Sequence, residues 1–138
     1  VSYFGYGPYE SYVDKRQASW ISRFDTTVAA MHEPYLMPQE NGSHCGTEWA
    51  EIRNGMGAGV RFVAEGGMSF NASHHTPEAL AEAMHPHELQ ACEQTIVHLD
   101  WMNSGVGSNS CGPLLLPQYQ LNHKELDFQL RIVPFGTR

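Results

Sequence analysis

The stretch from residue 47 to residue 65 constrains the fold most. Residues 47–53 and 59–65 are strand-like, and Asn54-Gly55-Met56-Gly57 separates them. Asn-Gly accepts the positive φ angles that tight hairpin turns require. This stretch therefore predicts a β-hairpin, and with it an antiparallel sheet.

Other short segments have the alternating or β-branched and aromatic composition of strands. They are residues 1–6, 19–23, 68–73, 95–102 and 126–133. Residues 26–31 suit a strand or a helix, because alanines favour the latter. Gly66-Gly67 predicts a turn between residues 59–65 and 68–73.

Residues 76–83 are the one convincing helix. Thr76 suits the N-cap and Pro77 the first helical position, while Glu78 complements the positive helix end and Pro86 limits the length. The sequence thus predicts an all-β antiparallel sandwich or curved double sheet with one short helix. At 138 residues, it predicts a single domain spanning 1–138.

Charge and cysteine content exclude several classes of function. Eight basic against fifteen acidic residues leave a net charge of −7, so we expect no nucleic-acid partner. No apolar run approaches the ~20 residues that span a bilayer, so we expect no membrane association.

Cys45, Cys92 and Cys111 are an odd, widely spaced set, which favours a reducing compartment and a cytoplasmic location. Val1 opens directly in a strand-like run, so we expect a longer parent protein.

The loop from residue 104 to residue 113 is the first candidate site. It holds three glycines and small hydroxyls between two predicted strands. Its GxxxxG spacing ends in Pro113 where a phosphate loop needs lysine, so phosphate binding is excluded. Cys111 would be a nucleophile only with a histidine partner that the sequence does not identify, and otherwise fills the loop.

The remaining candidates have ordinary structural interpretations. His74, His75, His85 and His87 flank the helix and raise the question of zinc, but no ligand cluster accompanies them, so we predict no metal site. Glu40 is interpreted as a buried carboxylate that accepts hydrogen bonds from turn amides rather than as a catalytic acid. Three tryptophans are interpreted as core or sheet-face residues rather than sugar platforms: Trp20, Trp49 and Trp101.

Five motifs in chain order resemble one family, the large bacterial β-galactosidases of glycoside hydrolase family 2. Residues 5–15 resemble its G-x-G-P-x-E-x-Y-x-D-R segment, with Lys15 in the arginine position. Residues 35–42 resemble Y-x-x-P-x-E-N-G, and residues 70–73 resemble F-N-x-S. His85-Pro86-His87-Glu88-Leu89 matches a further element, and Leu99-Asp100 leads into Gly105-Val106-Gly107.

This resemblance implies a place in a larger enzyme. The chain is similar to the C-terminal portion of the small-chain domain, an antiparallel supersandwich of the galactose mutarotase type. The family hydrolyses terminal β-galactosides with retention, using two glutamates on a separate barrel domain or large subunit. By resemblance the full enzyme uses Mg²⁺ and Na⁺ and is a homo-oligomer. We expect no catalytic residue and no cofactor in this chain.

The resemblance also gives the loop a role, as part of the wall of the active site. Family members carry a tryptophan that stacks on sugar at the position of Cys111, so that platform is missing here. Asn109, Ser110 and Cys111 are the predicted substrate-binding residues. Two alternatives stay open, a free-standing carbohydrate-binding β-sandwich and a mutarotase-like enzyme that uses histidines and a glutamate.

Overall fold

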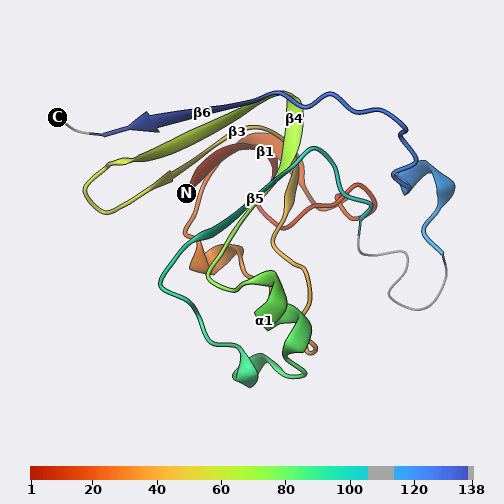
Figure 1. The fold of residues 1–138 in the computed structure, drawn as a ribbon, viewed down its shortest axis with the longest axis horizontal. Helices are drawn as coiled ribbons and strands as arrows, with labels where there is room; N and C mark the ends of the chain where they lie inside the picture. The colour runs from red at the N-terminus through yellow and green to blue at the C-terminus, as the bar shows by residue number, and fades with distance from the viewer. Residues whose placement is uncertain (106–113, 137–138) are drawn as a thin grey trace.

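The computed structural model describes residues 1–105 and 114–136 (Figure 1). Its strands are β1 (Ser2–Gly7), β2 (Trp20–Asp25), β3 (His44–Arg53), β4 (Gly59–Ser73), β5 (Ile96–Asp100) and β6 (Leu130–Phe135). The helix is α1 (Pro77–Glu82), and three 3-10 segments are Ala29–Met31, Pro86–Glu88 and Pro117–Tyr119. Among these residues the all-β prediction with one short helix is confirmed. No described helix is long and apolar enough to cross a membrane.

All strands join one antiparallel sheet in the order β2-β1-β3-β4-β5, with β6 also paired to β4. β3 and β4 form the predicted hairpin, in which Arg53 pairs with Gly59 across the Asn54 turn. Asn54 stabilises that turn, because its Oδ1 accepts hydrogen bonds from the backbone N–H groups of Met56 (2.9 Å) and Ala58 (3.1 Å).

β4 bends along its length, and each of its two halves pairs with a different strand. Its first half, from Gly59 to Ala64, pairs with β6, and its second half, from Ser69 to Ser73, pairs with β5. Gly66 and Gly67 lie between the halves, both at φ +87°. The expected turn at these glycines is therefore wrong. The backbone makes an irregularity within one continuous strand, which bends the sheet without ending it.

The core lies on one face of this curved sheet. Its fully buried members come from β1, β3, β4 and the first 3-10 segment: Tyr3, Met31, Ala50, Ala64, Met68, Phe70 and Ala72. Tyr3 and Ala50 are cross-strand partners, as are Ala64 and Leu130, so pairing register aligns these side chains. Small alanines beside large aromatic rings let the strands pack closely against Met31.

The predicted helix begins as the sequence indicates. Thr76 is the N-cap, and its hydroxyl accepts a hydrogen bond from the backbone N–H of Ala79 at 3.2 Å. Leu80 is its buried residue. Figure 1 shows α1 away from the β3–β4 hairpin tip.

Two other element predictions need correction. Residues 26–31 form no strand, since Ala29–Met31 is a 3-10 turn closed by the bond from Met31 N–H to Val28 O at 3.2 Å. The strand expected at residues 126–133 is displaced to Leu130–Phe135. Residues 130–135 pair with Gly59 to Ala64 of β4. This pairing sets the position of the strand, and the alternation of apolar residues at 126–133 does not.

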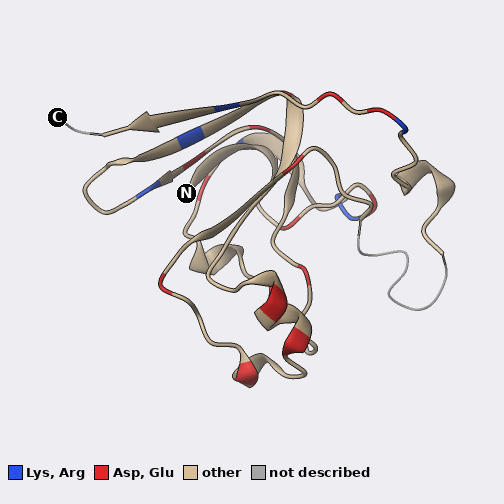
Figure 2. Cartoon of the chain, in the orientation of Figure 1, with Lys and Arg blue, Asp and Glu red and all other residues tan. Residues whose placement is uncertain are grey.

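Charge is distributed unevenly over this fold. Figure 2 shows acidic residues on α1 and the Pro86–Glu88 segment, and basic residues on the β3–β4 hairpin and β6. On the hairpin, Glu51 pairs with both Arg53 (3.2 Å) and Arg61, whose guanidinium lies over the Trp49 ring at 5.0 Å. The described basic residues of the hairpin are thus engaged with neighbours on the sheet.

Candidate functional site

A buried carboxylate organises the part of the molecule that carries the family-like motifs. Glu10 follows β1, and its side chain is only 3% exposed. Its Oε1 accepts hydrogen bonds from Lys15 Nζ and from the Tyr35 hydroxyl, and its Oε2 accepts one from Gly42 N at 2.8 Å. We call Glu10, Lys15, Tyr35 and Gly42 the Glu10 network. It connects the first two motifs of the sequence.

Charge stabilises this network. Desolvation of the Lys15 ammonium opposes its protonation, but the hydrogen bonds to Glu10 and Tyr35 outweigh that effect and raise the pKa of Lys15. Lys15 Nζ also donates to the Tyr35 hydroxyl at 2.6 Å. A buried carboxylate is tolerated only when paired and fully hydrogen-bonded, and here three donors meet that requirement.

Backbone bonds reinforce the same junction. Ser11 N–H donates to Ser43 O at 2.7 Å, and Cys45 N–H donates to Ser11 O at 3.2 Å. Tyr12 is completely buried, its hydroxyl accepts from Ser43 N–H at 3.4 Å, and burial raises the pKa of the Tyr12 phenol. Residues 10–12 are thus fixed to the chain just before and at the start of β3.

The third motif joins through an amide. Asn71 on β4 is buried, and its Nδ2 donates to Asn41 O at 2.7 Å, while Asn41 Oδ1 accepts from Glu33 N–H at 3.0 Å. Asn71 also pairs across the sheet with His98 on β5. The motifs at residues 5–15, 35–42 and 70–73 are therefore one connected structure, although long stretches of sequence separate them.

Glu40 does not have the environment that its sequence context suggests. The residue is exposed, and the carboxylate that accepts a turn amide is that of Glu10, which binds Gly42. The prediction of a buried Glu40 that accepts turn amides is wrong, because the residue is exposed and the Gly42 amide donates to Glu10 instead. Local loss of hydration raises the pKa of Glu40, His98 and Asn71 oppose that rise, and Asp100 and Glu10 add to it.

The base of the candidate loop lies against this connected structure. Gly105 has φ +77°, and a Cβ atom at this position would overlap the carboxylate of Asp14. A cavity of about 220 Å³ is lined by residues that include Val13, Arg16, Trp101 and Met102. The predicted binding residues Asn109, Ser110 and Cys111 lie outside the described residues.

The histidines do not gather into a metal centre. His85 stacks on His87 with ring centroids 5.4 Å apart, and its Nδ1 lies 3.0 Å from Glu88 Oε1. His75 packs against His32 at 4.8 Å, whereas His74 Nδ1 lies near Gln94 O at 3.2 Å. Within residues 1–105 and 114–136, no group of three or more His, Cys, Asp or Glu side chains is arranged to hold a metal ion.

None of the tryptophans is a core residue. Trp20 is 56% exposed and packs edge-on against Phe24 at 5.8 Å. Trp49 lies on a sheet face under Arg61, and Trp101 follows β5 with its ring edge-on to His123 at 5.0 Å. The sheet-face interpretation holds for Trp20 and Trp49, while Trp101 borders the loop-base cavity.

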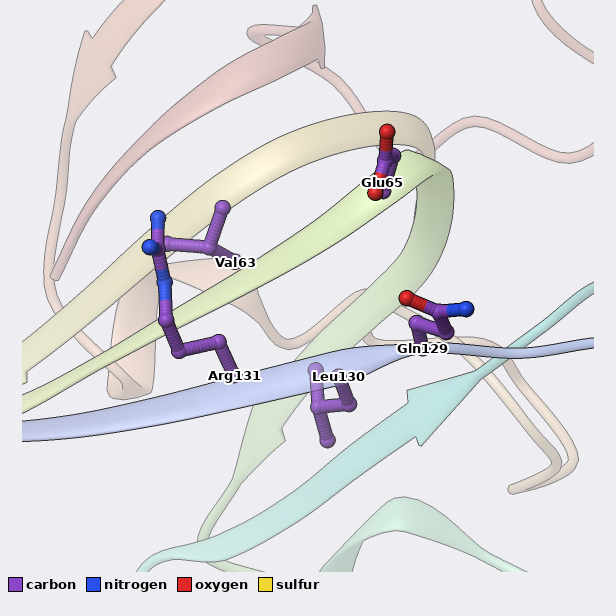
Figure 3. A pocket seen from close by; sticks show the side chains of 5 residues that line it. All are labelled: Val63, Glu65, Gln129, Leu130 and Arg131. Carbon is purple, nitrogen blue, oxygen red and sulfur yellow. The ribbon is translucent and has the colours of Figure 1, made fainter.

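A second hollow, of about 460 Å³, opens where β4 bends (Figure 3). Glu65 and Gln129 lie at the bend, with Arg131, Val63 and Leu130 further along the paired strands. No residue of the family-like motifs lines it. We therefore place the candidate site at the loop base, which lies next to the first of those motifs through Val13 and Asp14.

A family model described as "Beta galactosidase small chain" matches residues 1–132. The chain belongs to the β-galactosidase small-chain family. It is 39% identical over 132 residues to a β-galactosidase of Staphylococcus xylosus and 42% identical over 133 residues to one of Actinobacillus pleuropneumoniae. Each match covers 96% of this chain but 13% of the relative. A β-galactosidase of Arthrobacter is 30% identical over 137 residues, which are 14% of its length.

Membership of the small-chain family confirms the resemblance drawn from the five motifs. Interpretation of the residues missed the Glu10 network, even though Glu10, Lys15 and Tyr35 all stand in quoted motif positions. The only signal in the sequence was that Glu10, Lys15 and Tyr35 are polar residues within glycine- and proline-containing motifs. Nothing in the linear sequence indicated that they share one buried carboxylate.

Proposed function

We propose that this chain is the accessory C-terminal domain of a retaining β-galactosidase that hydrolyses terminal β-D-galactosides. The observation that carries this proposal is the match of nearly the whole chain to about one eighth of much larger β-galactosidases. The two catalytic glutamates belong to a separate barrel domain or large subunit. This chain supplies the loop at residues 104–113 to the rim of the active site.

The structure of the described residues supports a rim role over an independent catalytic role. Retaining glycosidases need two carboxyl groups about 5 Å apart on facing walls of a sugar-sized cleft. Glu10 is buried and fully hydrogen-bonded, so its carboxylate is not available to a substrate. It instead holds together the segments next to the loop base, which is what a supporting domain needs.

Activity measurements test whether catalysis belongs to the rest of the enzyme and the rim loop to this chain. The purified 138-residue chain should not hydrolyse nitrophenyl galactoside, whereas the complete enzyme that carries it should. Removal of the domain from the complete enzyme should reduce activity strongly. Turnover by the isolated chain would contradict the proposal. Galactoside binding by the isolated chain with no loss of activity on its removal would favour a free-standing carbohydrate-binding module.

The loop residues are tested in the complete enzyme. Replacing Cys111 by Trp restores an aromatic platform, so we expect the KM for lactose to fall by about threefold or more. Asn109→Ala and Ser110→Ala should raise KM, because they remove groups that hydrogen-bond sugar hydroxyls. Cys92→Ser is the control, since Cys92 Sγ donates to His74 O at 3.0 Å and a hydroxyl can replace it. Unchanged KM in all loop variants would contradict the rim role.

The remaining expectations complete the proposal. The partner is the rest of the β-galactosidase, as the same polypeptide or a separate subunit, and the full enzyme is a homo-oligomer in the cytoplasm. Cys45 and Cys92 are both free thiols, which suits a reducing compartment. Analytical ultracentrifugation of the complete enzyme tests the oligomer. Fractionation of the source cells tests the location.

A further inference from the structure

A hollow of about 480 Å³ opens beside the Glu10 network. Its walls come from the segment after β1, the turn that leads into β2 and the segment after the first 3-10 turn. Sites that bind small molecules have volumes of about 300–1,000 Å³ and combine apolar surface with a few polar groups. The residues that decide the chemistry of this hollow are Tyr9, Lys15, Arg16, Gln17, Ser19 and Glu33.

Tyr9 gives the hollow an aromatic side chain that is held at its backbone. The residue is 60% exposed, although it directly precedes the buried Glu10, whose carboxylate accepts three hydrogen bonds. Ser19 Oγ donates to the Tyr9 carbonyl at 3.4 Å, which joins the two segments that border the hollow. A rigid aromatic residue on a fixed backbone loses little entropy when a ligand packs against it. Tyr9 is thus suited to bind the apolar surface of a ligand.

Side chains beside Tyr9 keep hydrogen-bond donors in reserve. The Lys15 ammonium has three N–H groups and uses two of them, for Glu10 and Tyr35, while its side chain is 47% exposed. Gln17 Oε1 accepts from the backbone N–H of Arg16 at 3.1 Å, which fixes the side-chain amide. The two N–H groups of that amide make no hydrogen bond to another described residue. Donors are therefore free on two neighbouring parts of the wall.

Acceptors complete the lining. The backbone N–H of Glu33 donates to Asn41 Oδ1 at 3.0 Å, and the Glu33 carboxylate has no hydrogen bond to another described residue. The Arg16 guanidinium lies 5.1 Å from the centre of the Tyr6 ring, which limits its movement. Two basic and two acidic side chains line the hollow, so it carries no net charge. Balanced charge favours a neutral ligand with several hydroxyl groups over an ion.

We propose that this hollow binds a neutral saccharide, at a site separate from the loop at residues 104–113. The apolar C–H surface of a sugar ring packs against Tyr9, and its hydroxyl groups donate to Glu33 and accept from Gln17 and Lys15. The inference goes beyond the proposed rim role and does not depend on it. It assigns the chain a carbohydrate site built entirely from the segments around the Glu10 network.

The test uses the complete β-galactosidase that carries this domain, with one catalytic glutamate replaced so that lactose stays intact. Equilibrium dialysis against radiolabelled lactose should show two sites per chain, one in the active site and one in the hollow. Tyr9→Ala should weaken the second site by about tenfold, because the apolar contact is lost. Tyr9→Phe keeps the ring and should bind like the parent. Gln17→Ala should weaken the second site by about threefold.

Two variants outside the hollow are the matched controls. Met56→Ala removes a side chain that is 79% exposed in the hairpin turn, and Gln118→Ala removes an exposed amide. Both should bind lactose like the parent. An equal loss of the second site in Met56→Ala and Tyr9→Ala would overturn the assignment to the hollow.

The remaining outcomes also decide the proposal. Two sites in the parent, with the second weakened in Tyr9→Ala and Gln17→Ala, support it. Two sites that neither substitution changes overturn it and assign the second site to another part of the enzyme. A single site in the parent also overturns it, and a lower melting temperature of Tyr9→Ala would then indicate that another part of the enzyme packs into the hollow. Activity of the isolated chain and KM of the loop variants test the rim role separately.

Discussion

The buried carboxylate of Glu10 accepts a hydrogen bond from the backbone N–H of Gly42 at 2.8 Å. That contact joins the segment after β1 to the segment before β3, beside the backbone bonds of Ser11 to Ser43 and Cys45. The other oxygen of Glu10 binds Lys15 and Tyr35, so one side chain unites both motif regions. A buried charge thus links the segments of the fold that carry the first two motifs.

Glu10→Gln should lower the free energy of unfolding of the chain by about 2 kcal/mol, because the charge that Lys15 requires is lost while an oxygen acceptor remains. Glu10→Ala should cost about 3 kcal/mol or more, because Gly42 N–H then lacks its buried acceptor. Urea denaturation followed by circular dichroism measures both. Glu93→Gln, at an exposed glutamate, is the control and should change stability by less than about 0.5 kcal/mol. Equal effects of Glu10→Gln and Glu93→Gln would contradict this account.

The bend of β4 depends on backbone conformation at its two glycines. Gly66→Ala should destabilise the chain by about 1–2 kcal/mol, because φ of +87° is unfavourable for alanine although no atom lies within 4 Å of the added methyl. Gly67→Ala should cost a similar amount for the same reason. Gly55→Ala is the matched control, since its position is equally open and its φ is not in the positive region. A Gly55 effect as large as that of Gly66 would rule out the backbone explanation.

His44 makes stability depend on pH. Burial lowers the pKa of His44 from 6.5 to about 4, against the opposing effects of its bond to Tyr6 O and of Glu10. Between those two values the unfolded chain binds more protons at this site than the folded chain, so stability falls as pH falls. The contribution is about 2–3 kcal/mol between pH 7 and pH 4.5.

Between pH 7 and pH 4.5, the free energy of unfolding of His44→Gln should fall by about 2–3 kcal/mol less than that of the parent chain. This holds even if the variant is less stable at pH 7. His87→Gln, at an exposed histidine, should keep the parent dependence. Parallel pH profiles for His44→Gln and the parent chain would show that His44 does not titrate as described.

Loss of the N-cap of α1 should lower the free energy of unfolding by less than loss of the Glu10 carboxylate does. Thr76→Ala removes the hydroxyl that accepts from Ala79 N–H and should cost about 1 kcal/mol. Thr76→Ser keeps the acceptor and should lie within about 0.5 kcal/mol of the parent. Thermal denaturation of the three proteins in parallel checks the order. A serine variant as unstable as the alanine variant would assign the effect to the lost methyl group.

Local chemistry was sufficient for several elements. Asn54-Gly55 predicted the hairpin turn, and Thr76-Pro77-Glu78 predicted the start of α1, because each depends on interactions within four residues. The displacement of β6 shows the limit of such reasoning. Alternation at residues 126–133 suits a strand as well as residues 130–135 do, and the choice between them comes from the partners on β4.

The sequence by itself determined the antiparallel hairpin, the capped helix and, through five ordered motifs, the β-galactosidase small-chain family. Tertiary structure decided that Gly66-Gly67 bends a strand instead of ending it, and that Glu10 rather than Glu40 is the buried carboxylate. The Asn54 turn and the Thr76 cap depend on hydrogen bonds between near neighbours in the chain, so the sequence reveals them. A buried charge and its donors come from distant segments, and only the folded sheet brings them within hydrogen-bonding distance.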